Sequence, residues 1–453
     1  MRLVMVAVFV FWSCGVLSPA GGGEAWRDEI DSIVETDSGA GESITKLRAA
    51  GPTALEALFA YREQLAGPDG SEATGETAIR LQRLNAAIDR VGGARHCSVS
   101  RLYWYTGLER AREAAEKSGK PILSLHMMGQ LTDELSCANS RFFRTALYAN
   151  AAVAAVLRDE FVLHWHSVRP VPKVTVDFGD GRKLERTLTG NSIHYVLTSD
   201  GWPVDGLPGL YGPDAFLQHV RNAAELARGI RTLAPQARGT ALAQLHHRQL
   251  EALTTRWMQD LQQVAPQVPA DEPLNAVLEK FGAAEAAASI AQPKAIVEMP
   301  LITSVTLNPF ALLAVDPQSL ERATTPELWQ KLALLHADQA HLDESSVALM
   351  SRHLPAVAAD AVSPTKSLAE SPLLKMVDSF ERSMALDTVR NEYLLHRQIH
   401  EWYVKREVTS DVTALNERVY DELFLTPSSD PWLGLVRDDT YTALDDSGIV
   451  SKD

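Results

Sequence analysis

Cys137 is the residue whose type and place in the sequence could do covalent chemistry. It stands at the start of a predicted helical stretch, residues 137–158, shortly after the apolar run of residues 121–125. At a helix N-terminus, unpaired backbone N–H groups and the helix dipole favour negative charge, so they lower the pKa of a thiol and favour the nucleophilic thiolate. Cys137 is therefore a candidate nucleophile. The alternative is a small residue buried at a helix start, with Asn139 and Ser140 as capping residues.

Three histidines could join Cys137 in a metal site. His164 and His166 alternate along a predicted strand, so both side chains point to the same face, and His126 follows the apolar run. Zinc and copper use such nitrogen and sulfur ligands. The spacing forms no dense cluster, however, and surface or packing roles explain these histidines more simply. We expect no bound cofactor and keep His126, His164 and His166 only as candidate metal ligands.

Other histidine patterns do not complete a motif. His396 and His400 have the i, i+4 spacing of helical metal ligands, but a zinc protease needs Glu directly after the first His, where Arg397 stands. His246 and His247 adjoin on another helix, point in different directions and need no function. The sequence also lacks a Gly-rich phosphate-binding loop with Lys and a serine in a nucleophile-elbow context, so no Ser-His-Asp triad can be assembled.

Residues 100–228 alternate between strand and helix patterns, which predicts a mixed sheet with helices on its faces. The nearly continuous apolar run is typical of a buried central strand. Gly119 stands at the C-cap of the helix before it, and Gly179-Asp180-Gly181 indicates a hairpin. The predicted strands are 101–105, 121–125, 161–166, 174–178, 184–188 and 194–197, and the predicted helices are 108–118, 137–158 with a break near Asn150, and 214–228.

This order of elements resembles the thioredoxin superfamily, and more closely its exported bacterial thioredoxin-like branch. The resemblance rests on Gly119-Lys120-Pro121 before the central strand, on Cys137 soon after it, on the helix and strand of residues 150–161, and on the Asp200-Gly201 turn between the last two strands. It covers a little over a quarter of the chain. It implies a thioredoxin-like α/β domain at residues 100–228, with Cys137 at the position of the reactive cysteine.

Two positions depart from the motif that this resemblance implies. The family's second cysteine falls at Ser140, in Cys137-Ala138-Asn139-Ser140, and a hydroxyl cannot form the disulfide that releases a bound partner. The family's cis-proline falls at Ser192, where a cis bond would cost about 2.5–4 kcal/mol and a trans bond is the default. Dithiol oxidoreductase activity is therefore not expected. We expect a binding or structural role, with monothiol thiol-disulfide chemistry or redox sensing at Cys137 as the alternative.

Cys97 is the only other cysteine outside the N-terminal leader. It precedes the first predicted strand by about four residues, so it should lie near the opposite end of the sheet from Cys137. A disulfide needs Cα atoms within about 7 Å of each other. We therefore expect Cys137 to be a free thiol, although a loop before residue 100 that folds back would allow a bridge.

Residues 1–20 read as a secretory signal peptide. Arg2 precedes a short apolar run, and Ser18-Pro19-Ala20 supplies a small-x-small cleavage site. The run is too short to span a bilayer, which needs roughly 20 apolar residues. We expect cleavage after Ala20 and a soluble, secreted or periplasmic protein. Lipid attachment through Cys14 is disfavoured, because Phe11 stands where such motifs usually have a small aliphatic residue.

Charge and periodicity describe the rest of the chain. With 43 basic and 58 acidic residues, its net charge of −15 repels phosphate backbones and anionic lipids. We therefore expect no nucleic-acid partner and no membrane span, and a protein partner of unknown kind.

Periodicity predicts a helical segment at residues 26–95 and a mainly helical C-terminal domain at residues 235–453. In the latter, one helix should follow Leu242, Leu245, Leu253, Trp257 and Leu261, another should span 379–407, and the tail 425–435 should dock on the body.

Overall fold

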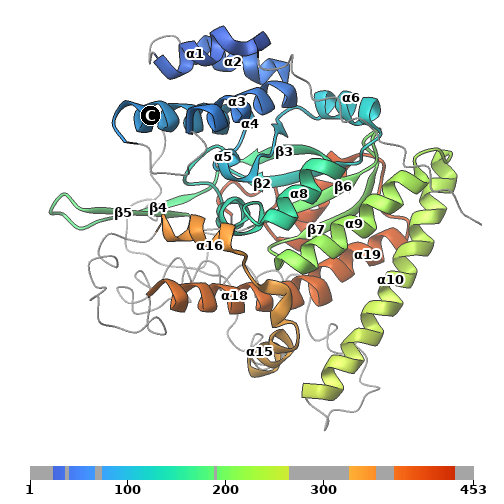
Figure 1. Cartoon of the computed structure of the whole chain (residues 1–453). Coiled ribbons are helices and arrows are strands. Elements are labelled where there is room, and N and C mark those ends of the chain that lie inside the picture. Colours follow the sequence, from blue (N-terminus) through green and yellow to red (C-terminus); the bar gives the residue numbers. More distant parts are fainter. Residues whose placement is uncertain are drawn as a thin grey trace, which may run out of the picture. The chain divides into compact units, whose positions relative to one another are not determined.

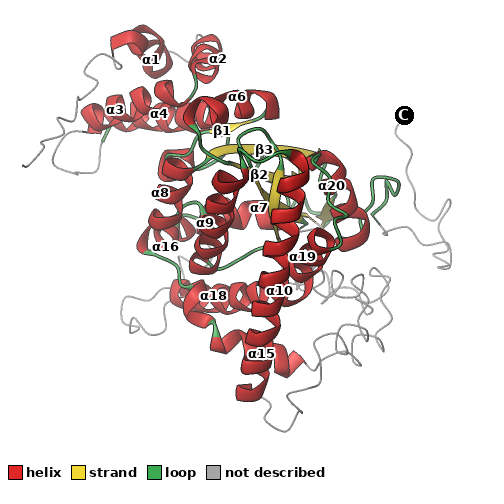
Figure 2. Ribbon diagram, turned by 90° about the vertical axis from the view of Figure 1, so that its right-hand side faces the viewer, coloured by secondary structure: helices red, strands yellow, loops and turns green. Residues whose placement is uncertain are grey.

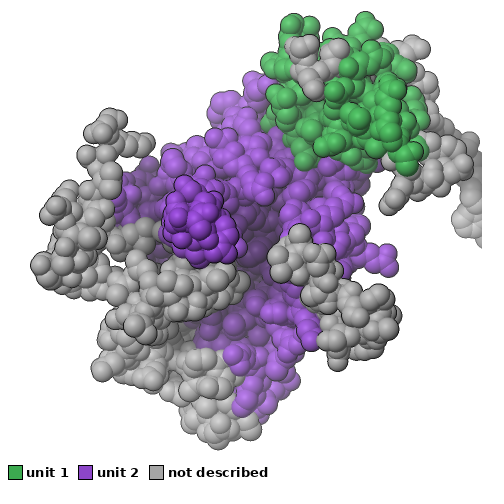
Figure 3. All heavy atoms as spheres, turned by 90° about the vertical axis from the view of Figure 1, so that its left-hand side faces the viewer, with its two compact units in different colours: residues 1–91 green, residues 92–453 purple. Residues whose placement is uncertain are grey.

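The computed structural model describes residues 24–35, 40–66, 74–187, 191–264, 326–353 and 372–433. The predicted signal peptide and Cys14 lie outside these described residues. The chain divides into two units, residues 1–91 and residues 92–453 (Figure 3). The domain boundary predicted near residue 235 falls inside the second unit, so the sheet and the C-terminal helices belong to one unit.

The first unit is helical, as the periodicity of residues 26–95 predicts. Apolar residues that recur at helical spacing form its core, including Leu58 and Phe59 of one helix and Leu84 and Ile88 of another, all fully buried. Its elements are η1 (Glu24–Trp26), α1 (Arg27–Glu35), α2 (Ala40–Ala50), α3 (Pro52–Ala66) and α4 (Glu76–Gly92).

A mixed five-stranded sheet lies at the centre of the second unit (Figure 1). The strand order is β1-β3-β2-β6-β7, in which β1, β3 and β2 run parallel while β6 is antiparallel to both β2 and β7. The strands are β1 (Trp104–Tyr105), β2 (Ile122–Met128), β3 (Val162–Arg169), β6 (Ser192–Leu197) and β7 (Pro203–Pro208).

The central strand is the one that its apolar run predicts. Every residue of β2 is buried, as expected for a strand with neighbours on both sides and helices on both faces. The strand predicted at 101–105 is shorter, because β1 is an edge strand that pairs with β3 at only two positions. The predicted hairpin forms a separate two-stranded sheet of β4 (Lys173–Asp177) and β5 (Lys183–Thr187).

Helices cover both faces of the sheet. His194 and Tyr195 are adjacent in β6 and point to opposite faces. The His194 ring packs on Phe216 of α9 (Pro213–Ile230), whereas the Tyr195 hydroxyl donates to Asn416 of α20 (Val412–Arg418). The mixed sheet with helices on its faces is therefore confirmed.

Two predictions about helix ends are confirmed. The helix α6 (Leu108–Ser118) ends at Gly119, whose φ of 72° and bond from its N–H to the carbonyl of Ala115 form a left-handed C-cap. The helical stretch after Cys137 consists of α7 (Ala138–Phe142), the π-helical turn η2 (Phe143–Leu147) and α8 (Ala151–Glu160). Asn150 causes the break, because its side chain accepts hydrogen bonds from the first backbone N–H groups of α8.

The remaining helices of the second unit pack on the sheet or on one another: α19 contacts β7, α10 packs along α19, and α15 contacts α10 and α18 (Figure 2). The helix predicted at 379–407 begins earlier and ends at Val404, with a π-helical turn in its middle. The short α5 (Cys97–Ser100) precedes the sheet, and the C-terminal elements are α10 (Pro235–Val264), α15 (Pro326–Leu335), η3 (Ala337–Ala340), α16 (Glu344–Ser351), α18 (Pro372–Arg390), η5 (Asn391–His396), α19 (Arg397–Val404), α20 and η6 (Val419–Leu423).

The start of the C-terminal tail docks on the sheet, as predicted for its described part. The guanidinium of Arg169, at the end of β3, donates to the backbone carbonyls of Thr426, Pro427 and Asp430. Asn191 donates to the hydroxyl of Thr426 as well. Among the described helices, none is both long and apolar enough to cross a membrane.

Candidate functional site

Cys137 lies where the sequence places it, just beyond the end of the central strand and at the N-cap of α7. Its backbone N–H donates to the carbonyl of Met128, the last residue of β2, at 3.3 Å. Its thiol is free, and its exposed fraction is 0%. Cys137 therefore stands at a helix start, as predicted, but its sulfur is closed off from solvent.

Ser140, at the position of the missing second cysteine, is also fully buried. Its Oγ lies 2.7 Å from the hydroxyl oxygen of Ser136 and 2.7 Å from the carbonyl oxygen of Cys137. Both neighbours belong to the same turn, so the hydroxyl of Ser140 is satisfied locally. It donates to these oxygens and accepts no backbone N–H among the described residues, and Cys137 is the N-cap of α7, so Ser140 does not cap the helix as the alternative interpretation predicted.

Ser192, at the cis-proline position, begins β6 and is fully buried. No cis peptide bond occurs in the described chain, so the bond before Ser192 is trans, the default for a residue other than proline. The side-chain amide of Asn139 donates to Ser192 Oγ at 3.0 Å. A buried hydrogen bond thus joins the helical segment that follows Cys137 to the first residue of β6.

Two arginines follow Cys137 on the same helical stretch. Arg144 is buried and donates to the carbonyl of Leu131 at 2.9 Å. Burial lowers the pKa of Arg144 to about 10 and also lowers that of Arg141, while the charge of a Cys137 thiolate acts in the opposite direction on both. Both arginines thus belong to the helical stretch that begins at Cys137, Arg141 in α7 and Arg144 in η2.

The three candidate histidines share one face of the sheet, as their alternation predicts. The rings of His126 and His166 lie 5.3 Å apart, and those of His126 and His164 lie 6.3 Å apart. Ser124 Oγ joins two of them, at 2.8 Å from His164 Nδ1 and 3.1 Å from His126 Nε2. Burial lowers the pKa of His164 to about 4 and that of His126 well below its usual value. These two rings are therefore neutral, and a serine hydroxyl links them.

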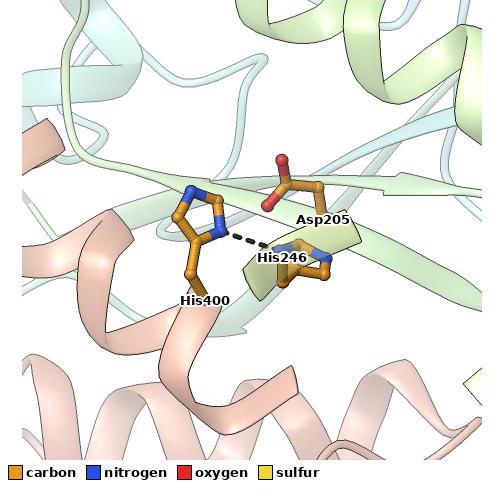
Figure 4. Close-up of side chains that lie close together, drawn as sticks. All are labelled: Asp205, His246 and His400. Atoms are coloured by element: carbon orange, nitrogen blue, oxygen red, sulfur yellow. Dashed lines mark hydrogen bonds between the residues drawn. The ribbon is translucent and has the colours of Figure 1, made fainter. Parts of the chain in front are cut away.

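A different set of side chains reaches the spacing of metal ligands. Within the described ranges, groups of three His, Cys, Asp or Glu whose ligand atoms all lie within 4.8 Å of one another are limited to Asp205, His246 and His400. Figure 4 shows these three side chains pointing toward one another. The set contains neither Cys137 nor the three histidines of the β2–β3 face.

Sequence reasoning missed this set for an identifiable reason. His246 was assigned no role, yet it lies on the buried stripe of α10 four residues after Leu242 and is fully buried. A histidine on an apolar stripe needs a hydrogen-bond partner or a ligand. That position, together with the i, i+4 pair of His396 and His400, was the available signal. No motif pointed to Asp205.

Comparison of the chain with protein-family models, with curated proteins and with solved structures finds no match. The functional interpretation therefore depends on the residues themselves.

Proposed function

We propose that residues 100–228 form a thioredoxin-like domain that performs no dithiol chemistry and serves as a binding or structural framework in an exported protein. Four features support the fold assignment. The central strand β2 leads to Cys137 at a helix start, and β1 is parallel to β3 and β2. Ser192 lies beside the Cys137 helix, and the Asp200-Gly201 turn joins β6 to β7.

The complete burial of Cys137 carries the functional proposal. Thiol-disulfide exchange requires that a partner's sulfur reach the thiolate. Cys137 and Ser140 are both 0% exposed, and the Asn139–Ser192 hydrogen bond joins the helix start to the sheet beside them. A partner could reach this sulfur only after the segment opens. The absence of a second thiol one turn later removes the usual way of releasing a mixed disulfide.

A framework role also fits the packing of the C-terminal helices on the sheet. Tyr195 of β6 donates to Asn416 of α20, and Tyr420 of η6 donates to the carbonyl of Asn191. Asn391, in η5, donates to the carbonyl of Leu210 just after β7. These buried bonds attach three C-terminal elements to one sheet, so the sheet organises the larger helical assembly.

The pH dependence of Cys137 alkylation tests this proposal. The native full-length protein is treated with iodoacetamide between pH 5 and pH 9, and the modification of Cys137 is followed by peptide mass mapping. We expect Cys137 to react at least about 100-fold more slowly in the native protein than in urea, which corresponds to a local opening free energy of about 2.7 kcal/mol. A Ser118→Cys variant supplies an exposed thiol on α6 as the matched control.

Rapid alkylation of native Cys137 at mildly acidic pH would contradict the framework proposal. It would support the alternative of monothiol chemistry or redox sensing, for which the position of Cys137 at a helix start is the structural argument. The Ser118→Cys control must react at the ordinary rate of an exposed thiol, with a rate that rises steadily toward the usual thiol pKa near 8.5.

A further inference from the structure

Asp205, His246 and His400 come from three elements that are far apart in the sequence. Asp205 lies in β7, His246 in α10 and His400 in α19, and α19 packs against both β7 and α10. Their exposed fractions are 3%, 0% and 4%. Burying three titratable side chains at one point costs free energy unless each is hydrogen-bonded or coordinates a metal ion. The three side chains therefore require a specific stabilising interaction at the place where they meet.

The outer contacts of two of these residues are those that orient metal ligands. His246 Nε2 donates to the carbonyl of Val204 at 3.0 Å, which directs Nδ1 of the same ring toward His400. Asp205 Oδ1 lies 2.8 Å from His396 Nε2 and accepts the N–H of Gly206 at 2.8 Å. Metal-binding histidines usually donate their second N–H to a carbonyl or carboxylate, and metal-binding carboxylates are usually hydrogen-bonded in turn.

The imidazole rings of His246 and His400 approach each other through their Nδ1 atoms. His246 Nδ1 lies 2.8 Å from His400 Nδ1 (Figure 4). Burial lowers the pKa of His246 to about 4 and that of His400 well below its usual value, so both rings are neutral near pH 7. Two nitrogens bound to one zinc ion at about 2.0–2.1 Å in tetrahedral geometry are ~3.3 Å apart. To bind one ion, the two Nδ1 atoms must move about 0.5 Å further apart than their present 2.8 Å, and both rings must turn so that their lone pairs point at the ion.

The geometry points to a buried site for a divalent transition-metal ion, bound by a carboxylate oxygen of Asp205, Nδ1 of His246 and Nδ1 of His400. Two neutral imidazoles and one carboxylate are ligands that suit Zn²⁺, and the single carboxylate offsets one of the two charges of the ion. The same ligand set also suits Fe²⁺. Calcium and magnesium are poor candidates, because they require mainly oxygen ligands.

Two buried hydroxyls provide an independent sign of a further ligand. Three protein ligands leave at least one coordination position, which water commonly fills. The hydroxyls of Tyr211 and Tyr403 are buried and lack a hydrogen-bond partner among the residues that the structure describes. Burial raises the pKa of both, and the charge of nearby Asp205 raises each further. The Tyr403 ring also stacks on His246 at 4.0 Å. A metal-bound water is the kind of partner that a buried hydroxyl beside the site, such as that of Tyr403, would need.

Metal analysis of the untagged full-length protein tests the site. The protein is produced in medium supplemented with zinc, dialysed against a weak chelator and analysed by inductively coupled plasma mass spectrometry, which also distinguishes zinc from iron. We expect one ion per chain in the natural sequence and its loss in His400→Ala and Asp205→Asn. His396→Gln removes the imidazole that contacts Asp205 and packs on the His400 ring, and should weaken zinc binding by about 10–100-fold.

His247→Ala is the matched control, because His247 follows His246 on the same helix and its side chain is 62% exposed. This variant should keep the full metal content. A second measurement does not depend on the folding of variants: cobalt added to chelator-treated natural protein should give the visible absorption bands of a low-coordinate nitrogen and oxygen site. The assignment is overturned if the natural protein binds neither zinc nor cobalt. It is also overturned if His247→Ala loses as much metal as His400→Ala, or if His400→Ala folds and keeps its metal. None of these outcomes bears on the reactivity of Cys137.

Discussion

Acid should destabilise this protein through His194, a histidine that is buried without charge compensation. Its ring is fully buried between Phe143 and Phe216, at centroid distances of 4.6 Å and 5.1 Å. The Tyr148 hydroxyl lies 2.6 Å from Nε2, and Nδ1 lacks a hydrogen-bond partner within the described residues. Burial lowers the pKa of His194 to about 3. The folded protein therefore holds this ring neutral, whereas the unfolded chain protonates it near pH 6.5.

The sign and size of the effect follow from proton binding. Between about pH 3 and pH 6.5 the unfolded state binds one more proton at this residue than the folded state, so the contribution of His194 to stability is complete above pH 6.5 and is lost as the pH falls. Each pH unit in this window costs about 1.36 kcal/mol. Lowering the pH from 7.5 to 5.0 covers about 1.5 units of the window and should remove about 2 kcal/mol at this residue alone.

Urea unfolding at pH 7.5 and pH 5.0, followed by near-UV circular dichroism, measures this contribution. We compare the natural sequence with His194→Gln, in which an amide oxygen can still accept the Tyr148 hydroxyl but no group titrates. The loss of unfolding free energy between the two pH values should be about 2 kcal/mol smaller in the variant. His247→Gln, at an exposed position, should behave like the natural sequence. Equal losses in His194→Gln and the natural protein would refute the argument.

Three further changes test other parts of the structure. Gly209→Ala should lower the unfolding free energy by about 1–3 kcal/mol in urea denaturation. Gly209 has a φ of +81°, and an added Cβ would lie 2.6 Å from the Asn391 amide nitrogen. An unchanged denaturation midpoint would contradict this. Arg169→Ala removes the donor to the carbonyls of the docked tail, so limited proteolysis after residue 424 should be about tenfold faster, given about 1.5 kcal/mol for one charge-assisted bond. N-terminal sequencing of exported protein should begin directly after Ala20, and an intact leader would refute the signal-peptide prediction.

Features set by short-range chemistry could be predicted from the sequence. Gly119 closes α6 because a glycine takes up the left-handed conformation at low cost, and Asn150 begins α8 because its side chain accepts backbone N–H groups. The continuous apolar run predicted β2 as a central strand, and the position of Cys137 at a helix start follows from the same local pattern. Each of these depends on residues within a few positions of one another, which is the range that a sequence displays directly.

Only the tertiary structure decided whether these residues could act. The place of Cys137 in the chain gives no measure of its access to solvent, because its burial depends on distant segments such as β6, whose Ser192 accepts a hydrogen bond from Asn139. His246 and His400 are 154 residues apart, and Asp205 lies on a third element. Periodicity shows that one face of α10 is buried, but it does not show which face of another element meets it. Long-range packing determines which faces meet, and it thereby brings together the three side chains of the candidate metal site.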